Sequence, residues 1–299
     1  MHTSIMGTTG WTVPIQGLGC MRMGEHRTPS DEAESAEVII RALDRGVTLL
    51  DTADMYGRGR NEEIVGRAVR GRRDEALLCT KFGVVHGTES SWTTRGDAAY
   101  VRDACDASLR RLAVDVIDLY YMHRRDVDVP IEETVGAMAE LVSAGKVRHL
   151  GLSEVTGDEL RSAHGVHPIT AVQSEWSLCA RRVETMIPVC AELGVGVVPY
   201  SPQGHGLLNS TKTVSQLAKI SPEYAALPER LAEVAHKHGA KPGQIALAWV
   251  QQRATEWGIA VTPIPGTTQL RHLEENIAAI DISLDVQDLE RLDVRPDRG

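Results

Sequence analysis

Four side chains in the first half of the sequence could act together in proton transfer. Asp51, Lys81 and His123 each end a short, mostly apolar segment, and Tyr56 stands five residues after Asp51 in a glycine-rich loop. Side chains at the carboxyl ends of parallel strands gather at one face of a barrel, where such folds build their chemistry. The spacing therefore predicts that these four side chains meet at a single site.

Eight segments have the length and apolar character of strands, and helical patterns separate them. The strand segments are residues 15–21, 47–52, 76–81, 116–123, 147–153, 171–175, 195–200 and 259–264. The helical segments are residues 31–43, 61–70, 97–112, 130–145, 158–163, 182–193, 223–238, 242–251, 269–277 and 286–292. Alternating strands and helices form a parallel sheet, and a count of eight indicates closure. The sequence predicts an α/β fold: a (β/α)8 TIM barrel with an N-terminal β-hairpin at residues 4–13 and extra C-terminal helices.

Length and composition indicate a single globular unit. No proline- or serine-rich linker divides the 299 residues, so we expect one barrel domain over residues 1–299. The net charge of −9 comes from scattered charges without a basic block, which disfavours nucleic-acid and membrane partners. The first residues lack the pattern of a secretion signal. Five cysteines without CxxC spacing indicate reduced thiols and no metal site, so we expect a cytoplasmic protein.

Three other sequence motifs that would indicate a different kind of site are not present in the sequence. Gly17, Gly19 and Gly24 suggest a dinucleotide-binding turn, but the pattern G-x-G-x-x-G requires glycine where Arg22 stands. The chain also has no G-x-S-x-G nucleophile elbow and no phosphate-binding lysine loop of the Walker type. Hydrolase and kinase chemistry therefore lack their usual motifs.

Several separated motifs resemble the aldo-keto reductase family over nearly the whole chain. They are LLDTADMYG at residues 49–57, TKFG at 80–83, DLYYMH at 118–123, GLSE at 151–154, VPYSPQGHGLL at 198–208 and PIPGTTQLRHLEENIAA at 263–279. Within the family, the chain looks most similar to the branch of perakine reductase and pyridoxal reductase-like enzymes. Each of the four side chains named above also has an ordinary structural explanation, but their joint occurrence matches the Asp, Tyr, Lys, His tetrad of this family.

The resemblance implies that the protein reduces small-molecule aldehydes or ketones by hydride transfer, with a catalytic tetrad of Asp51, Tyr56, Lys81 and His123. Tyr56 would protonate the forming alkoxide, and the Lys81 ammonium would lower the pKa of the tyrosine. Asp51 would keep Lys81 charged. A neutral His123 would orient the carbonyl group. Substrate contacts would come from Tyr56, Trp92, His123 and Arg124.

The resemblance also implies a nicotinamide cofactor bound along the same face. The matching positions are Cys20, Met21, Asp51, Ser153, Glu154, Gln173, Tyr200, Ser201, Pro202, Gln203, Gly204, His205, Gly206, Ile264, Gly266, Thr267, Thr268, His272, Glu275 and Asn276. We expect NADPH. NADH is the alternative, because Gln269 and His272 stand where related proteins carry lysine and arginine, which reduces the positive charge around a 2′-phosphate. The segment at residues 209–221 is also shorter than the cofactor-covering loop of related proteins.

A second function class remains open from the sequence. A regulatory or binding protein of the same fold, such as a potassium-channel β subunit, would use the bound cofactor as a sensor. The intact tetrad favours the enzyme. We further expect a monomer or weak homo-oligomer.

Overall fold

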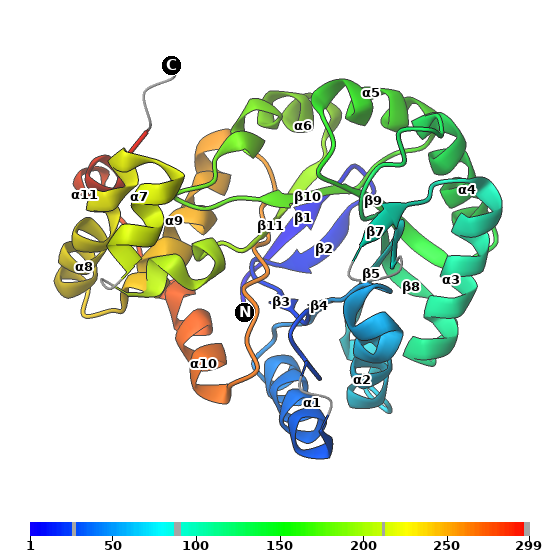
Figure 1. The fold of residues 1–299 in the computed structure, drawn as a ribbon, viewed down its shortest axis with the longest axis horizontal. Coiled ribbons are helices and arrows are strands. Elements are labelled where there is room, and N and C mark those ends of the chain that lie inside the picture. Colours follow the sequence, from blue (N-terminus) through cyan, green and yellow to red (C-terminus); the bar gives the residue numbers. More distant parts are fainter. Residues whose placement is uncertain (26–27, 87–90, 211–212, 296–299) are drawn as a thin grey trace.

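The structure is a computed structural model that describes residues 1–25, 28–86, 91–210 and 213–295. Its centre is a parallel sheet curled into a barrel with helices around the outside (Figure 1). In space the strands follow the order β3-β4-β5-β8-β9-β10-β11. This arrangement confirms the predicted TIM barrel. The strands are β3 (Leu18–Gly19), β4 (Leu49–Asp51), β5 (Leu77–Phe82), β8 (Ile117–Met122), β9 (Val147–Ser153), β10 (Ala171–Glu175) and β11 (Gly196–Tyr200).

The predicted eighth strand, residues 259–264, closes the barrel without forming a continuous ladder. Toward β11, the N–H groups of Thr262 and Ile264 donate hydrogen bonds of 3.0 and 2.9 Å. Toward β3, the carbonyl groups of Pro263 and Pro265 accept hydrogen bonds of 2.9 and 3.4 Å. Since proline has no N–H group, these residues cannot donate in return. Among the described residues, isolated bridges therefore replace a ladder, one at Val261 to β11 and one at Gly266, just past the segment, to β3.

The helices cover the outside of the barrel, and α7, α8 and α11 gather at one side, on the left of Figure 1. No helix in the described ranges is long and apolar enough to span a membrane. The α-helices are α1 (Pro29–Asp44), α2 (Arg60–Ala68), α3 (Ala98–Leu112), α4 (Ile131–Ser143), α5 (Gly157–Val166), α6 (Ile187–Leu193), α7 (Val214–Ile220), α8 (Leu227–Lys237), α9 (Pro242–Trp257), α10 (Leu270–Ala278) and α11 (Val286–Leu292). The 3-10 turns are η1 (Tyr56–Gly59), η2 (Arg73–Glu75), η3 (Arg182–Thr185), η4 (Gly204–Asn209), η6 (Pro222–Ala226) and η7 (Ala279–Asp281).

A hairpin closes the amino-terminal end of the barrel, as the sequence predicts. Its strands β1 (Thr3–Met6) and β2 (Trp11–Pro14) are antiparallel. The turn lies against the start of β10, and Gly7 adopts φ +73° there, which a residue with a side chain rarely does. Met6 and Val13 are completely buried among the side chains inside the barrel. The hairpin is thus an apolar plug at the floor.

Two predicted helices are interrupted by proline. The segments at residues 182–193 and 223–238 each begin as a 3-10 turn and continue as a separate α-helix, α6 or α8. Pro188 and Pro228 stand in the first turns of these α-helices. Proline is tolerated in a first turn but cannot donate to a preceding turn. The prediction of one continuous helix is therefore wrong for both segments.

Two elements at the carboxyl ends of the strands were not predicted. A small antiparallel pair, β6 (Val84–His86) and β7 (Trp92–Thr94), follows β5. Helix α7 lies inside residues 209–221, which the sequence indicated as a loop. Strands of three residues are too short to show a clear alternation of apolar and polar side chains.

Gly66 of α2 offers a test of helix packing, because it lies against the end of α3. A carbon added at Gly66 would lie 2.3 Å from the backbone oxygen of Leu112, which cannot rotate away. We expect Gly66→Ala to lower the free energy of unfolding by about 2 kcal/mol, as overpacking does. Gly136→Ala in α4 has nothing within 4 Å of the added carbon and should raise that free energy by about 0.5–1 kcal/mol. Urea denaturation measures both, and equal effects would contradict the packing.

Candidate active site

A buried ion pair between Asp51 and Lys81 lies at the centre of the candidate site. Asp51 ends β4 and Lys81 lies in β5, and their side chains are 3% and 0% exposed. Lys81 Nζ donates to Asp51 Oδ1 and, at 2.7 Å, to the carbonyl oxygen of Thr52. From β10, Gln173 Nε2 donates to Asp51 Oδ2 at 2.8 Å. These hydrogen bonds offset part of the cost of burying two charges.

Tyr56 reaches this pair from the loop that follows β4. The loop is tied to β5 by the N–H of Asp54, which donates to the carbonyl oxygen of Lys81 at 3.0 Å. Tyr56 begins η1, in which Arg58 takes a left-handed conformation with φ +58°. Lys81 Nζ lies 5.2 Å from the centroid of the tyrosine ring. The ring of His123 meets it edge-on, with centroids 5.8 Å apart and an angle of 87°. The structure thus brings the four predicted side chains together.

Burial and charge have opposite effects on the lysine and the tyrosine. Burial lowers the pKa of Lys81, but the nearby Asp51 and Tyr56 raise it above its usual value. The ammonium therefore stays charged. Burial raises the pKa of Tyr56, and the Lys81 ammonium acts against this rise. The expected lowering of the tyrosine pKa by the lysine is present, but burial outweighs it. The phenol therefore keeps its proton and can donate it.

His123 is neutral at physiological pH. Burial lowers its pKa to about 2, with further lowering by the charges of Lys81 and Arg124. Its Nδ1 atom is buried and has no hydrogen-bond partner among the residues that the structure describes. An N–H at that position would be left unsatisfied, so we place the proton of the neutral ring on Nε2. In that tautomer the ring can donate one hydrogen bond into the site.

Polar side chains at the ends of β9 and β10 adjoin the ion pair. Ser153 Oγ accepts a hydrogen bond of 3.1 Å from Arg124 Nη1, and Gln173 holds the buried carboxylate as described. The side chains of Ser153 and Gln173 are nearly inaccessible to solvent. Glu154 has φ +54°, and its Oε1 accepts the N–H of Glu175 at 3.0 Å. Three of the predicted cofactor residues therefore contact the predicted tetrad or lie beside it.

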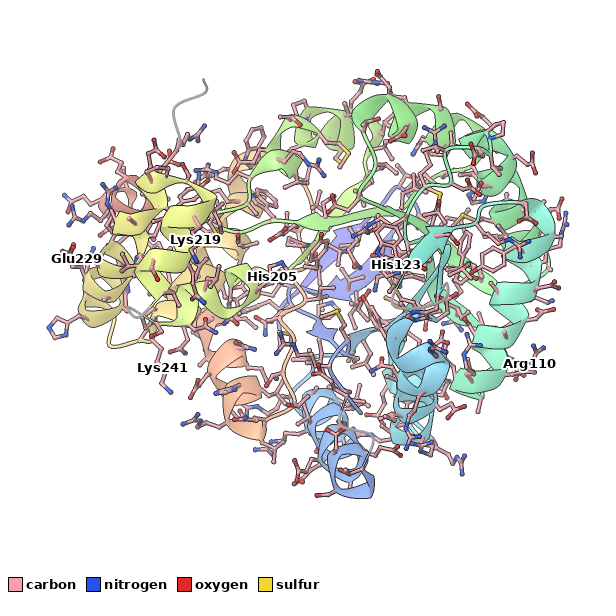
Figure 2. The ribbon with its side chains drawn as sticks, viewed as in Figure 1. Arg110, His123, His205, Lys219, Glu229 and Lys241 are labelled. Atoms are coloured by element: carbon pink, nitrogen blue, oxygen red, sulfur yellow. The ribbon has the colours of Figure 1, made fainter. Side chains whose placement is uncertain are left out.

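The segment at residues 201–206, directly after β11, turns tightly at the same face. Ser201, His205 and two glycines within it all have positive φ angles, between +48° and +89°. The Ser201 hydroxyl and His205 Nδ1 are 3.1 Å apart, and His205 Nε2 lies 3.2 Å from a carboxylate oxygen of Glu175. In Figure 2, His205 and His123 both lie toward the middle of the view. Backbone N–H groups in such turns can form concavities that bind anions.

A third group of predicted residues surrounds the start of α10. The hydroxyl oxygen of Thr267 accepts the N–H of Gln269 at 3.0 Å. Asn276 is buried, and its side-chain oxygen accepts a hydrogen bond of 3.0 Å from Gln203. This bond links the turn after β11 to α10. The two segments that the resemblance assigns to the cofactor are therefore in contact.

Lys241 also belongs to this region, although no sequence motif indicated it. The lysine precedes α9 and forms an ion pair with Glu275 Oε1 of α10. Arg271 Nε lies 3.8 Å from the same oxygen, and Arg271 Nη2 lies 3.1 Å from His272 Nε2. Two basic side chains, Lys241 and Arg271, thus lie against one carboxylate, and His272 lies against Arg271. Because Lys241 lies 34 residues from Glu275, no local motif could reveal the contact.

The remaining predicted residues differ in exposure. Met21 and Trp92 are 54% and 59% exposed, in segments that follow β3 and β5. Buried positions are Cys20, Pro202 and Ile264, and partly exposed ones are Tyr200 and Thr268. His86 of β6 lies 2.9 Å from the carbonyl oxygen of Met55, beside Tyr56. This contact joins the β6–β7 pair, which was not predicted, to the loop that carries Tyr56.

The residues at this face fit a dinucleotide with a nicotinamide ring. Ser153 and Gln173 offer buried polar groups next to the tetrad, as a carboxamide requires. A Cβ atom at Gly19 would lie 2.8 Å from the carbonyl oxygen of Ile264, so backbone alone lines that junction. Residues 201–206 and the nine-residue helix α10 present N–H groups suited to phosphates.

Comparison with known proteins identifies the family. The sequence profile of the Aldo/keto reductase family matches residues 17–294. A probable aldo-keto reductase 1 from Glycine max is 42% identical over 303 residues, which cover 96% of this chain and 86% of that protein. An aldo/keto reductase from Klebsiella pneumoniae, solved in complex with NADP and acetate, is 31% identical with a TM-score of 0.80, covering 99% of this chain and 96% of that one. The holo form of an aldo-keto reductase from Bacillus halodurans is 28% identical with a TM-score of 0.83, covering 98% and 95%.

The chain belongs to the aldo-keto reductase family. This confirms the resemblance inferred from the motifs at the level of the family. The narrower similarity to perakine reductase and pyridoxal reductase-like enzymes stays a prediction.

The low pKa of His123 predicts a measurable effect of pH on stability. In the unfolded chain the ring takes up a proton below about pH 6.5, whereas in the folded protein it stays neutral until about pH 2. Stability is therefore lost as the pH falls below 6.5. Between pH 6.5 and 5 this linkage amounts to about 2 kcal/mol, and His123→Gln should remove it. Denaturation at both pH values measures the difference between the two proteins. A His123 ring that titrates near pH 6 by NMR would contradict the assignment.

Proposed function

We propose that the protein is an NADPH-dependent reductase that converts aldehydes or ketones to alcohols, with the chain forming one barrel domain. The observation that carries the proposal is the buried Asp51–Lys81 ion pair beside the phenol of Tyr56, with the ring of a neutral His123 edge-on to that phenol. The family of the chain and its similarity to a reductase solved with NADP support the same activity.

The four side chains would divide the proton chemistry among them. When bound, the reduced nicotinamide would supply the hydride that the carbonyl carbon accepts. Tyr56 then gives its proton to the oxygen as negative charge develops there, so that the product is a neutral alcohol. Lys81 stabilises the phenolate left behind, and Asp51 holds Lys81 in place. His123 donates a hydrogen bond from Nε2 to the same oxygen and thereby orients the carbonyl group.

Three groups of residues would hold the cofactor. Ser153, Glu154 and Gln173 would bind the carboxamide, and Tyr200 would stack against the ring. The turn at residues 201–206 would follow the pyrophosphate. At the start of α10, Arg271 and His272 would face a 2′-phosphate, and Lys241 adds a charge there that favours NADPH over NADH.

The sensor function keeps the same fold and the same cofactor residues, but it has no need of a proton donor. No observation in the structure favours it over the reductase. A cytoplasmic location and a monomeric or weakly associated state stay predictions from the sequence.

The activity can be tested at its proton donor. We expect Tyr56→Phe to lower turnover of an aldehyde by about 10²–10⁴-fold, the usual contribution of a general acid. NADPH affinity should change little, because the phenol is proposed to act on the substrate. Steady-state kinetics at the nicotinamide absorbance and titration by tryptophan fluorescence measure the two quantities. Turnover within twofold of the parent would exclude Tyr56 as the acid, and a parent that reduces no aldehyde or ketone would favour the sensor.

Cofactor preference can be tested at the start of α10. The double change Gln269→Lys with His272→Arg should tighten NADPH binding by about tenfold, because a charge-assisted contact is roughly 1.4 kcal/mol or more. NADH affinity should stay within about twofold, since NADH lacks the 2′-phosphate. Lys241→Gln should weaken NADPH alone. If neither variant alters the ratio of the two affinities, the phosphate is bound elsewhere.

A further inference from the structure

Arg124 carries a charge that no carboxylate among the described residues neutralises. Its Nη1 atom donates to the carbonyl oxygen of His123 at 2.7 Å and to Ser153 Oγ at 3.1 Å. Across the described residues, no acidic oxygen lies within 4.0 Å of this guanidinium. The next residue is different, because Arg125 pairs with Glu159 at 2.6 Å. Two adjacent arginines therefore differ in whether a carboxylate already balances their charge.

The unpaired guanidinium lies within the candidate active site. It acts to lower the pKa of Tyr56, His123 and Tyr200, which places its charge close to all three. Arg124 is partly buried. Only Nη1 is bonded to described groups, so Nε and Nη2 keep donors that a ligand could use. A partly buried cation without a counterion is costly, and a bound anion would offset that cost.

The source of such an anion follows from the proposed function, on which this inference rests. The phosphates of the cofactor would lie along residues 201–206 and at the start of α10. The nicotinamide carboxamide, which would lie next to Ser153, carries no negative charge. An anion that reaches Arg124 would therefore be part of the substrate. The exposed side chains of Met21 and Trp92, in segments at the same face, would suit an apolar body on that substrate.

We propose that the preferred substrates are aldehydes or ketones that bear a carboxylate, and that Arg124 binds this carboxylate. The planar guanidinium presents paired N–H groups that match the two oxygens of a carboxylate, which lysine cannot do. The carboxylate takes no part in hydride or proton transfer, so the same bonds form and break as with a neutral substrate. Arg124 thus determines specificity.

The test compares two substrates of nearly equal shape, 4-carboxybenzaldehyde and 4-carbamoylbenzaldehyde, at pH 7 with NADPH. Only the first carries a charge. For the wild-type protein we expect kcat/KM to be at least tenfold higher for the carboxylate, and the ratio to fall as salt is added. A ratio near one would overturn the inference. This comparison uses no variant, so it stands even where a substitution prevents folding.

Variants then locate the effect. Arg124→Gln should reduce the ratio by about 10-fold to 100-fold, as expected for a charge-assisted, paired contact, and Arg124→Lys should keep part of it. Arg110→Gln is the matched control, because Arg110 is exposed near the end of α3 at the periphery of Figure 2 and should leave the ratio unchanged. An equal effect of Arg110→Gln would mean that general surface charge, rather than Arg124, sets the preference.

Two further outcomes separate this inference from the proposed function. Arg124→Gln could instead lower kcat/KM for both aldehydes equally and weaken NADPH binding in a fluorescence titration. Arg124 would then bind the cofactor, and this inference would fail while the proposed reductase activity stands. If the wild-type protein reduces neither aldehyde nor any other carbonyl compound, the proposed reductase activity fails, and the inference fails with it.

Discussion

Asp51 and Lys81 form a charge pair that is removed from water inside the barrel, and such removal costs several kcal/mol for each ion. The pair is tolerated because a hydrogen bond from Lys81 to Thr52 uses a second ammonium donor and a hydrogen bond from Gln173 reaches the second oxygen of Asp51. These contacts fix the ends of β4, β5 and β10 relative to one another. They also hold the loop that carries Tyr56, because Lys81 Nζ donates to the carbonyl oxygen of Thr52 at the start of that loop. The position of Tyr56 therefore depends on the ion pair.

The same burial sets the protonation states around the pair. Low solvent access would favour neutral groups everywhere, and it does keep Tyr56 protonated and His123 neutral. Lys81 and Asp51 are the exceptions. Asp51 is close enough to hold Lys81 charged, and Lys81 and Gln173 act against the rise that burial causes in the pKa of Asp51. One cation is thus placed between a phenol and a carboxylate. This order suits a phenol that must lose its proton only when an oxygen beside it becomes negative.

The sequence revealed those parts of the molecule that follow from local pattern. Asp51, Lys81 and His123 end apolar strands, and parallel strands bring such ends together, so the tetrad was predictable. Residues 259–264 were predicted as a regular strand because they are apolar, but Pro263 within the segment and Pro265 just after it have no N–H group to donate toward β3. Lys241 was missed because its contact with Glu275 joins distant segments. The sequence also did not reveal how deeply Tyr56 is buried, so the rise in the pKa of this tyrosine was not predicted.

Most of the strained backbone lies at one face of this fold. Among the described residues other than glycine, five have positive φ. Arg58, Glu154, Ser201 and His205 lie in loops after strands, at the face of the site, and the fifth, Ala113, ends α3 at the other end of the barrel. Each such residue costs about 1 kcal/mol or more. At the floor, by contrast, Met6 and Val13 of the hairpin are packed in an apolar cluster, and buried Asp118 accepts hydrogen bonds from the N–H of Leu78 and from two arginines. The floor can therefore offset strain at the opposite face, where the backbone must adopt unusual angles to surround a ligand.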